Sequence, residues 1–209
     1  MKGLGRKHAP DARDLQHLMA SKLPVTVTRP THKTWRLWWH GDQGDTPMCV
    51  GYGWHGLLRA LPHLQTDPKP AVLYHEAQLN DEFPGENYDG SSVRGGAKAL
   101  RKDGKITAYA WAFDVQTVVN WLATHGPVVM GTDWYDSMFT PDATGLVVPS
   151  GALAGGHCYV AIGYDDAKHI LICQNSWGMD WGLNGRFHLH YEDADALIKA
   201  NGEACTPTE

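Results

Sequence analysis

Between Cys49 and Leu61 the apolar residues recur at helical spacing, and Pro62 follows them as a stop signal. This pattern predicts a helix that begins at or near Cys49. Each glycine within a helix lowers its propensity by about 1 kcal/mol relative to alanine. The predicted helix contains three of them, Gly51, Gly53 and Gly56. A helix that keeps these glycines is expected to pack closely against another backbone.

The pattern of polar and apolar positions changes character along the chain. In the first 126 residues it predicts three further helices, each bounded by cap or stop residues, over 71–81, 92–104 and 114–126. Beyond Gly126, short β-rich runs separated by glycine, aspartate and proline predict strands at 128–130, 146–148, 158–163, 170–173 and 186–190. Residues 1–40 form an irregular lead-in with one possible short strand, 25–28. Helices followed by strands indicate an α+β fold.

Composition places the chain among globular proteins. It has 209 residues, an apolar fraction of 43% and a net charge of −5, so it can bury enough surface to offset the entropy of ordering. This excludes a disordered tail. The absence of a basic excess argues against a nucleic-acid partner.

Two further features bear on where the protein resides. No apolar run approaches the roughly 20 residues of a membrane-spanning helix, and the basic N-terminus is not followed by the apolar region of a secretory signal. We therefore expect a cytoplasmic protein without a membrane partner. Its cysteines form no C-x-x-C pair, which favours free thiols over a disulfide framework; they are Cys49, Cys158, Cys173 and Cys205.

Three segments carry the residue types that a thiol nucleophile needs. Gln43 lies six residues before Cys49, a glycine pair leads into His157, and Asn175 follows the next predicted strand. A helix N-terminus and an imidazolium can lower a thiol pKa to roughly 3.5–7.5. An asparagine can hold the tautomer of the imidazole, and a glutamine amide with a backbone N–H can stabilise an oxyanion. A hairpin could bring His157 and Asn175 together.

These segments resemble papain-like (C1 family) cysteine peptidases, in particular the bacterial and phage type without a large proregion. The most specific match is Asn175-Ser176-Trp177-Gly178, followed by Trp181-Gly182 and Gly185. Gly156-His157 with the run to Tyr164 is similar to the histidine strand of the family, and Gln43 and Cys49 match its oxyanion and nucleophile spacing. The resemblance covers most of residues 41–190.

The resemblance implies a role for each matched residue. Cys49 is the expected nucleophile, His157 the acid/base, Asn175 its orienter and Gln43 the oxyanion donor. Substrate contacts are implied for a further set, Gly90, Gly156 and Trp177. The family motif C-G-S-C-W is absent around the nucleophile, and His157 and Asn175 follow it at less than the usual separation of about 130–150 residues. A trimmed intervening subdomain is implied.

The resemblance also implies a papain-like architecture in one catalytic domain, residues 1–209. After the lead-in 1–40, a mainly helical subdomain is expected over about 41–110, and a mainly β, barrel-like subdomain over about 111–209. The active site would lie in the cleft between them. The implied activity is hydrolysis of peptide bonds in a peptide or protein substrate through a Cys acyl-thioester, with no cofactor.

Two alternatives to a peptidase remain open. The same triad could serve acyl transfer or deamidation, or the chain could be a non-catalytic peptide-binding or structural module. His188 and His190 could share one strand face, but no third ligand is evident, so no metal is expected. The tryptophans of 35–39 are expected in packing, with an exposed partner surface as the alternative.

Overall fold

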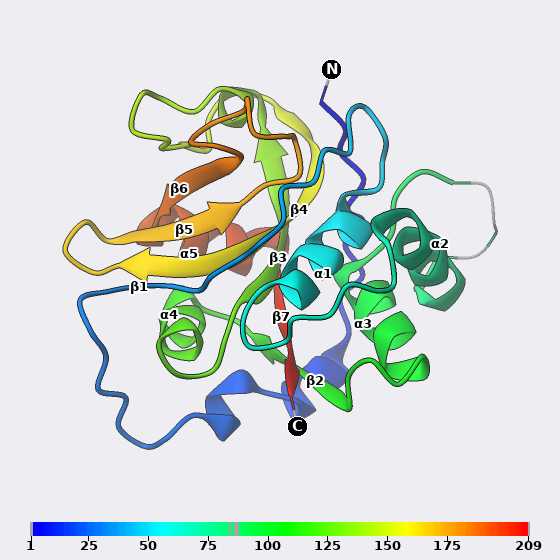
Figure 1. The fold of residues 1–209 in the computed structure, drawn as a ribbon, viewed down its shortest axis with the longest axis horizontal. Helices are drawn as coiled ribbons and strands as arrows, with labels where there is room; N and C mark the ends of the chain where they lie inside the picture. The colour runs from blue at the N-terminus through cyan, green and yellow to red at the C-terminus, as the bar shows by residue number, and fades with distance from the viewer. Residues whose placement is uncertain (1, 84, 86–87, 209) are drawn as a thin grey trace.

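One antiparallel sheet organises the computed structural model, which describes residues 2–208 apart from 84, 86 and 87 (Figure 1). Within the described residues the strand order is β2-β7-β3-β4-β5-β6, and β1 also pairs with β4. The strands are β1 (His32–Thr34), β2 (Ala108–Ala112), β3 (Val128–Tyr135), β4 (Leu153–Asp165), β5 (Ile170–Gln174), β6 (Arg186–His190) and β7 (Glu203–Thr208).

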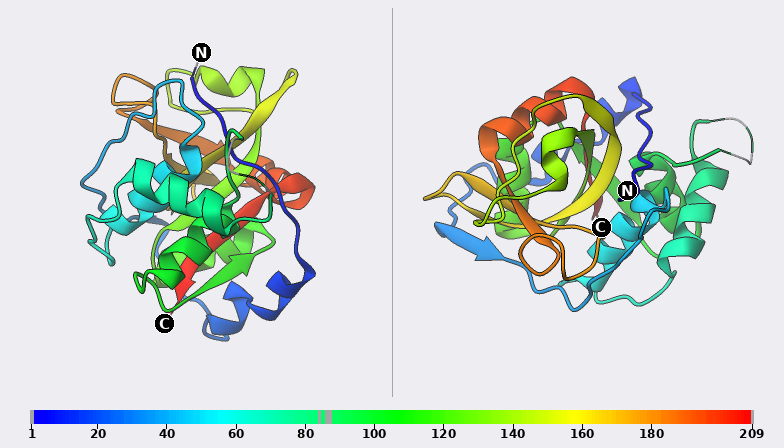
Figure 2. Two further views of the ribbon diagram at one scale, coloured as in Figure 1. Left: turned by 90° about the vertical axis from the view of Figure 1, so that its right-hand side faces the viewer. Right: turned by 90° about the horizontal axis from the view of Figure 1, so that it is seen from above.

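Helices pack on both faces of this sheet (Figures 1 and 2). The helices are α1 (Cys49–Arg59), α2 (Pro70–Asn80), α3 (Val93–Lys102), α4 (Val115–Thr124) and α5 (Tyr191–Asn201), with short 3-10 turns η1 (Ala12–Gln16), η2 (Met19–Lys22) and η3 (Asp136–Phe139). Buried residues of α1, α2 and α3 share one apolar cluster, and those of α4 and α5 belong to the other. No helix among the described residues has the length and apolar character needed to span a membrane.

The sheet separates the two clusters because side chains alternate along its central strands. On β3, Val129 faces the cluster of α1–α3, whereas Val128 and Met130 face the other. On β4, Val160 faces the cluster of α1–α3, and Tyr159 faces the other. These runs are buried on both faces, which explains why they read as continuous apolar stretches.

Cap residues fix the helix starts where the sequence predicted them. The Ser92 hydroxyl accepts a hydrogen bond from the Gly95 amide (2.9 Å), and the Asp114 carboxylate accepts one from Thr117 (2.7 Å). Each bond satisfies one of the free amides of the first helical turn. Together, the helices and the antiparallel sheet confirm the predicted α+β fold.

Several predicted strands differ from the observed ones. Residues 25–28 form no strand, because Val25 is fully exposed and has no apolar surface to pack on. The prediction for 146–148 was also wrong, since only Leu146 forms an isolated bridge, to His188. The sheet is not closed into a barrel: within the described residues, β2 and β6 lie at its two ends. The elements β2, β7 and α5 were not predicted.

Close packing against another backbone, as expected, explains Gly51, and a side chain of β4 explains Gly53. A Cβ at Gly51 would lie 2.2 Å from the carbonyl oxygen of Pro70 and 2.7 Å from the amide nitrogen of Tyr74, both in α2. A Cβ at Gly53 would lie 2.6 Å from the Sγ of Cys158 on β4. Helix α1 therefore approaches its neighbours on two sides at distances that only glycine permits.

Replacing Gly51 by alanine should destabilise the fold, although alanine favours a helix by about 1 kcal/mol. The added methyl group must push α1 away from the backbone of α2, at an expected net cost of about 1–3 kcal/mol. Urea denaturation measures the free energy of unfolding. Gly56→Ala is the matched control, because its Cβ meets only side chains, at 3.2 Å or more. Equal stability of Gly51→Ala and wild type would contradict the packing argument.

Candidate active site

Cys49 lies at the N-terminus of α1, where the sequence predicted it. Its side chain is fully buried. The contact of Gly53 with Cys158 fixes α1 against β4 one turn further along. Cys49 is thereby held beside the strand that carries His157.

His157 and Asn175 form a hydrogen-bonded pair across β4 and the end of β5. The two strands pair with Val160 opposite Gln174, which brings Asn175 level with the start of the apolar part of β4. The imidazole Nε2 lies 2.7 Å from the Oδ1 of Asn175, and the amide of Ser176 donates to the same oxygen (2.8 Å). Because an amide oxygen only accepts, Nε2 carries the hydrogen and Nδ1 presents a lone pair.

Two tryptophans enclose the imidazole of His157. The ring of Trp177 stacks on it with centroids 4.5 Å apart, and Trp134 meets it edge-on at 4.9 Å. Burial lowers the pKa of His157 to about 4, against the opposing effect of the Asn175 hydrogen bond. The imidazole is therefore neutral at pH 7. Trp134 was not among the site residues predicted from the sequence.

Gln43 is oriented by a residue of the asparagine segment. The Ser176 hydroxyl donates to the Oε1 of Gln43 (2.6 Å), so the amide nitrogen points the other way. That nitrogen donates to the carbonyl oxygens of Thr46 (2.8 Å) and Gly3 (3.1 Å). The side chain thus has a donor directed at a peptide carbonyl, the type of group that becomes an oxyanion during acyl transfer.

The Gly3 carbonyl belongs to residues 2–7, here called the covering segment. This segment runs between the helices and the sheet (Figure 2, left). Its backbone bonds to both sides. The amides of Gly5 and Arg6 donate to the carbonyl of Gly156 (3.0 and 2.9 Å). On the other side, the Ser91 amide donates to the carbonyl of Gly5 (2.9 Å), and the Lys7 amide donates to the carbonyl of Ser91 (2.8 Å).

The structure brings the three expected substrate-contact residues to this segment. Gly156 accepts the two bonds just described, and the Nε1 of Trp177 donates to the Gly3 carbonyl (3.3 Å). Gly90 has φ +93, and a Cβ there would lie 2.1 Å from the carbonyl oxygen of Gly5. The covering segment itself was not predicted from the sequence. A readable signal was the alternation of Gly3 and Gly5, which is typical of a strand in close backbone contact.

Coverage by this segment changes the chemistry expected for Cys49. Burial raises the pKa of the Cys49 thiol to about 12, against the opposing backbone hydrogen bonds of Cys158, Gly5 and Val50. The position of Cys49 at a helix N-terminus had predicted a lowered thiol pKa. Among the described residues no hydrogen bond joins the thiol to His157, and the Nδ1 of that ring has no partner. Both groups are therefore neutral in the covered state.

Other candidate groups lie apart from this site. The remaining cysteines are buried free thiols, Cys158, Cys173 and Cys205. His188 and His190 lie on β6, and the part of the chain that the structure describes holds no cluster of three potential metal ligands. Of the tryptophans in 35–39, Trp38 is 47% exposed, whereas Trp35 and Trp39 pack against the core. These residues therefore do not form a continuous exposed surface.

Comparison with known proteins identifies relatives of this arrangement. A family model described as "Papain family cysteine protease" matches residues 76–206. An uncharacterized peptidase C1-like protein of Acanthamoeba polyphaga mimivirus is 23% identical over 72% of this chain and 64% of its own length. The cathepsin B-like CP3 of Giardia intestinalis is 28% identical over 71% of the chain and 49% of its own length. The chain thus spans less than two thirds of these curated relatives.

Solved structures share the fold. Xylellain, a cysteine protease from Xylella fastidiosa, superposes with a TM-score of 0.77 at 20% identity, covering 100% of this chain and 98% of the other. Digestive procathepsin L 3 of Tenebrio molitor larval midgut gives a TM-score of 0.65 at 16% identity, over 100% and 76% of the two chains. At these identities the likeness extends to the fold alone.

Displacing the covering segment should make Cys49 reactive. In Gly5→Ala the new Cβ would lie 2.0 Å from the carbonyl oxygen of Pro47, a backbone atom, so the segment must move. We expect iodoacetamide to label Cys49 at neutral pH at least about tenfold faster than in wild type, since exposure favours the thiolate. Mass spectrometry of the labelled peptide measures the rate.

Gly104→Ala is the control for this experiment. Gly104 follows α3 at the end away from Ser91, and a Cβ there meets nothing within 4 Å. Because its φ is +66, alanine at this position strains the backbone locally, so the variant controls for a destabilising glycine replacement that leaves the covering segment in place. Its labelling rate should equal that of wild type. If Gly5→Ala labels no faster than Gly104→Ala, the segment does not shield the thiol.

Proposed function

Because the chain belongs to the papain family of cysteine proteases, we propose that it hydrolyses peptide bonds through an acyl-thioester on Cys49. One observation carries this proposal: the peptide backbone of residues 3–6 already lies against the Cys49 thiol, the Gln43 amide and Gly156, the neighbour of His157. A substrate peptide bound in its place would meet the same groups.

In the proposed reaction His157 is the general base and then the general acid. Its Nδ1 lone pair takes the proton of the Cys49 thiol as Sγ attacks the scissile carbonyl carbon. The resulting imidazolium gives that proton to the leaving amine, and the C–N bond breaks. A water molecule then attacks the thioester with the same assistance, which releases the acid product and restores the thiol.

Gln43 supports this reaction by stabilising the negative charge that develops on the carbonyl oxygen. Its amide nitrogen already donates to the peptide carbonyl of Gly3, and the Ser176 hydroxyl keeps it in that orientation. A backbone N–H at the start of α1 would supply the second donor. Such donors act without reorganisation because they are held before the substrate arrives.

The proposed resting form is the covered one. While residues 2–7 occupy the site, a substrate backbone cannot pair with Ser91 or Gly156, since the segment uses their main-chain groups. The buried Cys49 thiol also stays protonated. Activity therefore requires the segment to move, and assays are best made on a variant with a displaced segment.

The nucleophile is tested in the Gly5→Ala background with an epoxide inhibitor of cysteine peptidases and a fluorogenic peptide. Cys49→Ala should abolish both the covalent adduct and hydrolysis, because no other thiol lies at the N-terminus of α1. The matched control is Cys205→Ala, another buried thiol in the same apolar cluster. It should retain most of the activity.

Two results would count against the proposal. An adduct that persists in Cys49→Ala would assign the chemistry to another residue. The second is a Gly5→Ala variant that forms no adduct, hydrolyses no peptide and has four thiols of ordinary reactivity. This result would indicate the non-catalytic peptide-binding module.

The role of Gln43 is tested separately by kinetics in the same background. Gln43→Ala should lower kcat by roughly 10²–10³, as in other deletions of an oxyanion donor. Gln43→Glu should lower it further, because a carboxylate repels the developing negative charge. Ser176→Ala should give a smaller loss, since it only frees the amide to rotate. Unchanged kcat in both Gln43 variants would show that Gln43 is merely a loop residue.

A further inference from the structure

A cavity of about 420 Å³ lies at the end of the molecule away from the start of the covering segment. Its lining comes from four separate segments: η2, the loop after α1, the end of α4 and β7. In Figure 1, η2 and the C-terminal end of β7 lie at the lower edge of the view, whereas the covering segment begins at the upper edge. The described residues that line the cavity include none of the active site. Because small-molecule sites usually measure roughly 300–1,000 Å³, this cavity is large enough for a ligand of its own.

Three basic side chains line this cavity, here called the basic cavity. Lys22 is the exposed last residue of η2, His63 follows α1 and is partly buried, and His125 caps the end of α4. No carboxylate side chain lies among the described residues of the lining. The whole chain, in contrast, carries a net charge of −5. The cavity therefore has the electrostatic character that attracts an anion.

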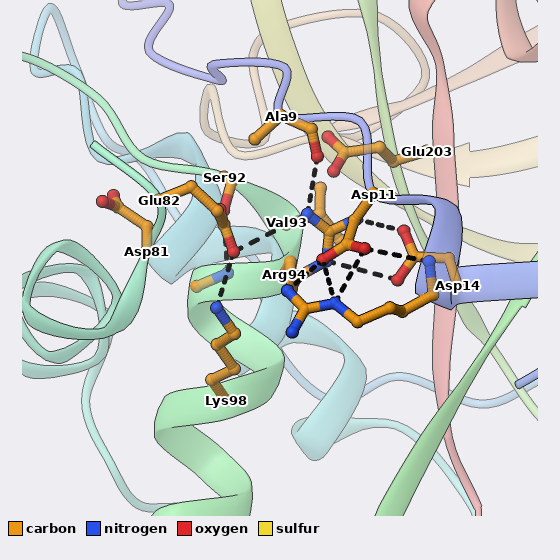
Figure 3. Close-up of polar contacts among 12 residues, drawn as sticks. Ala9, Asp11, Asp14, Asp81, Glu82, Ser92, Val93, Arg94, Lys98 and Glu203 are labelled. Atoms are coloured by element: carbon orange, nitrogen blue, oxygen red, sulfur yellow. Dashed lines mark hydrogen bonds and ion pairs between the residues drawn. The ribbon is translucent and has the colours of Figure 1, made fainter. Parts of the chain in front are cut away.

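Buried cations elsewhere in the molecule have carboxylate partners. Figure 3 shows the guanidinium of Arg94 directed at the Asp14 carboxylate, and an Nη of the same group lies 3.6 Å from the Oε1 of Glu82. The Nε of Arg6 donates in a similar way to the Oε2 of Glu203 (2.9 Å). Such pairs are expected because a buried charge without a partner is costly. Within the described residues, none of the three basic side chains of the cavity forms an ion pair.

The two imidazoles of the basic cavity are held in a state that an anion would change. Burial lowers the pKa of His63, and no other group among the described residues acts on that ring. Burial also lowers the pKa of His125, and the Lys33 ammonium adds to this effect. The Thr124 hydroxyl lies 2.7 Å from the Nδ1 of His125, which fixes the ring and leaves Nε2 for a ligand. A bound anion would favour the protonated form of both rings.

Apolar side chains form much of the remaining lining. The ring of Trp121 lines the cavity and stacks on the imidazole of His125, with centroids 4.1 Å apart and planes at 15°. Pro62 and Pro207 line it from the loop after α1 and from β7. A cavity that combines apolar rings with a few converging polar groups is typical of a site for a small organic molecule. The lining thus offers an apolar surface for the body of a ligand and cationic groups for its charge.

We propose that the basic cavity binds a small organic anion, in which a flat apolar body carries a carboxylate or a phosphate group. Lys22, His63 and His125 hold the anionic group through charge-assisted hydrogen bonds. Trp121 and Pro62 pack against the apolar body. Carboxylate and phosphate oxygens accept from the same donors, so the two kinds of ligand share this chemistry. The site is separate from Cys49, and binding to it does not depend on hydrolysis of a peptide.

The first test measures binding to the full chain by isothermal titration calorimetry. The probes are 2-naphthoate, 2-naphthyl phosphate and 2-naphthamide, which is the neutral isostere of the carboxylate. At least one anion should bind about tenfold or more tightly than 2-naphthamide, because the amide leaves the cations unpaired. The tighter of the two anions identifies the preferred anionic group. Affinities of both anions that do not exceed that of 2-naphthamide would overturn the inference.

Substitutions locate this binding in the basic cavity. Lys22→Gln changes an exposed side chain, so the fold is expected to persist, and the tighter anion should bind at least about fivefold more weakly. His63→Gln should weaken binding in the same direction. The matched control is Lys102→Gln, which removes the charge of an exposed lysine at the end of α3 that does not line the cavity. It should keep the wild-type affinity. Wild-type affinity in both Lys22→Gln and His63→Gln would overturn the inference.

The second test measures how the affinity for the anionic probe 2-naphthoate depends on pH. Between about pH 8 and pH 6 the affinity should rise at least about threefold, because a bound anion raises the lowered pKa values of the two imidazoles and binding therefore takes up protons. The charged groups beside these rings are Lys22 in the lining and Lys33 next to His125, and both are cations. In His63→Gln the rise should be smaller. An affinity that stays constant or falls as the pH is lowered would overturn the inference.

Discussion

Helix α1 can place Cys49 beside β4 only because glycines let its backbone approach both neighbours. Gly51 rests against the carbonyl of Pro70, and Gly53 rests against Cys158. A side chain at either position would move the N-terminus of α1, and with it the thiol, relative to the strand that carries His157. The glycines that lower the helix propensity of this segment are thus what positions its first residue. The glycines lower the helix propensity of α1, and they allow the close packing that fixes the position of the Cys49 thiol.

The covering segment links the accessibility of the site to its charge. The peptide that fills the space in front of Cys49 also removes water from it, and burial shifts the pKa of the thiol upward and that of His157 downward. Both shifts favour the neutral forms. A thiolate–imidazolium pair therefore needs water or a reacting carbonyl where the segment now lies. One contact thus governs both steric access and the protonation state of the nucleophile.

Sequence reasoning succeeded where the signal was local. Ser92 and Asp114 could be identified as caps because a cap acts within three residues of itself. The pairing of His157 with Asn175 followed from a motif on two adjacent strands. Helix α5 also carries a local signal that was not predicted, since Ala194, Leu197 and Ile198 follow helical spacing and are buried.

What could not be predicted depends on contacts between distant parts of the chain. Arg6 and Glu203 are 197 positions apart, and neither residue lies in a local pattern that signals the other. Strand β7 includes Pro207 and begins with a glutamate, so it does not have the composition of a buried strand. All five residues of β2 are apolar, and this run was a readable strand signal. Their place in the sheet follows from pairing with each other and with β3. Only the assembled fold specifies such elements.

The positions that hold the covering segment also dictate when it can dock. Gln43, Ser91, Gly156 and Glu203 come from the beginning, middle and end of the chain. A ribosome makes the segment before these partners, which are complete only after β7 has left the exit tunnel and joined the sheet. Residues 2–7 are thus synthesised before all of their partners and reach their native contacts after them, and a chain stalled before Glu203 would leave the nucleophile uncovered.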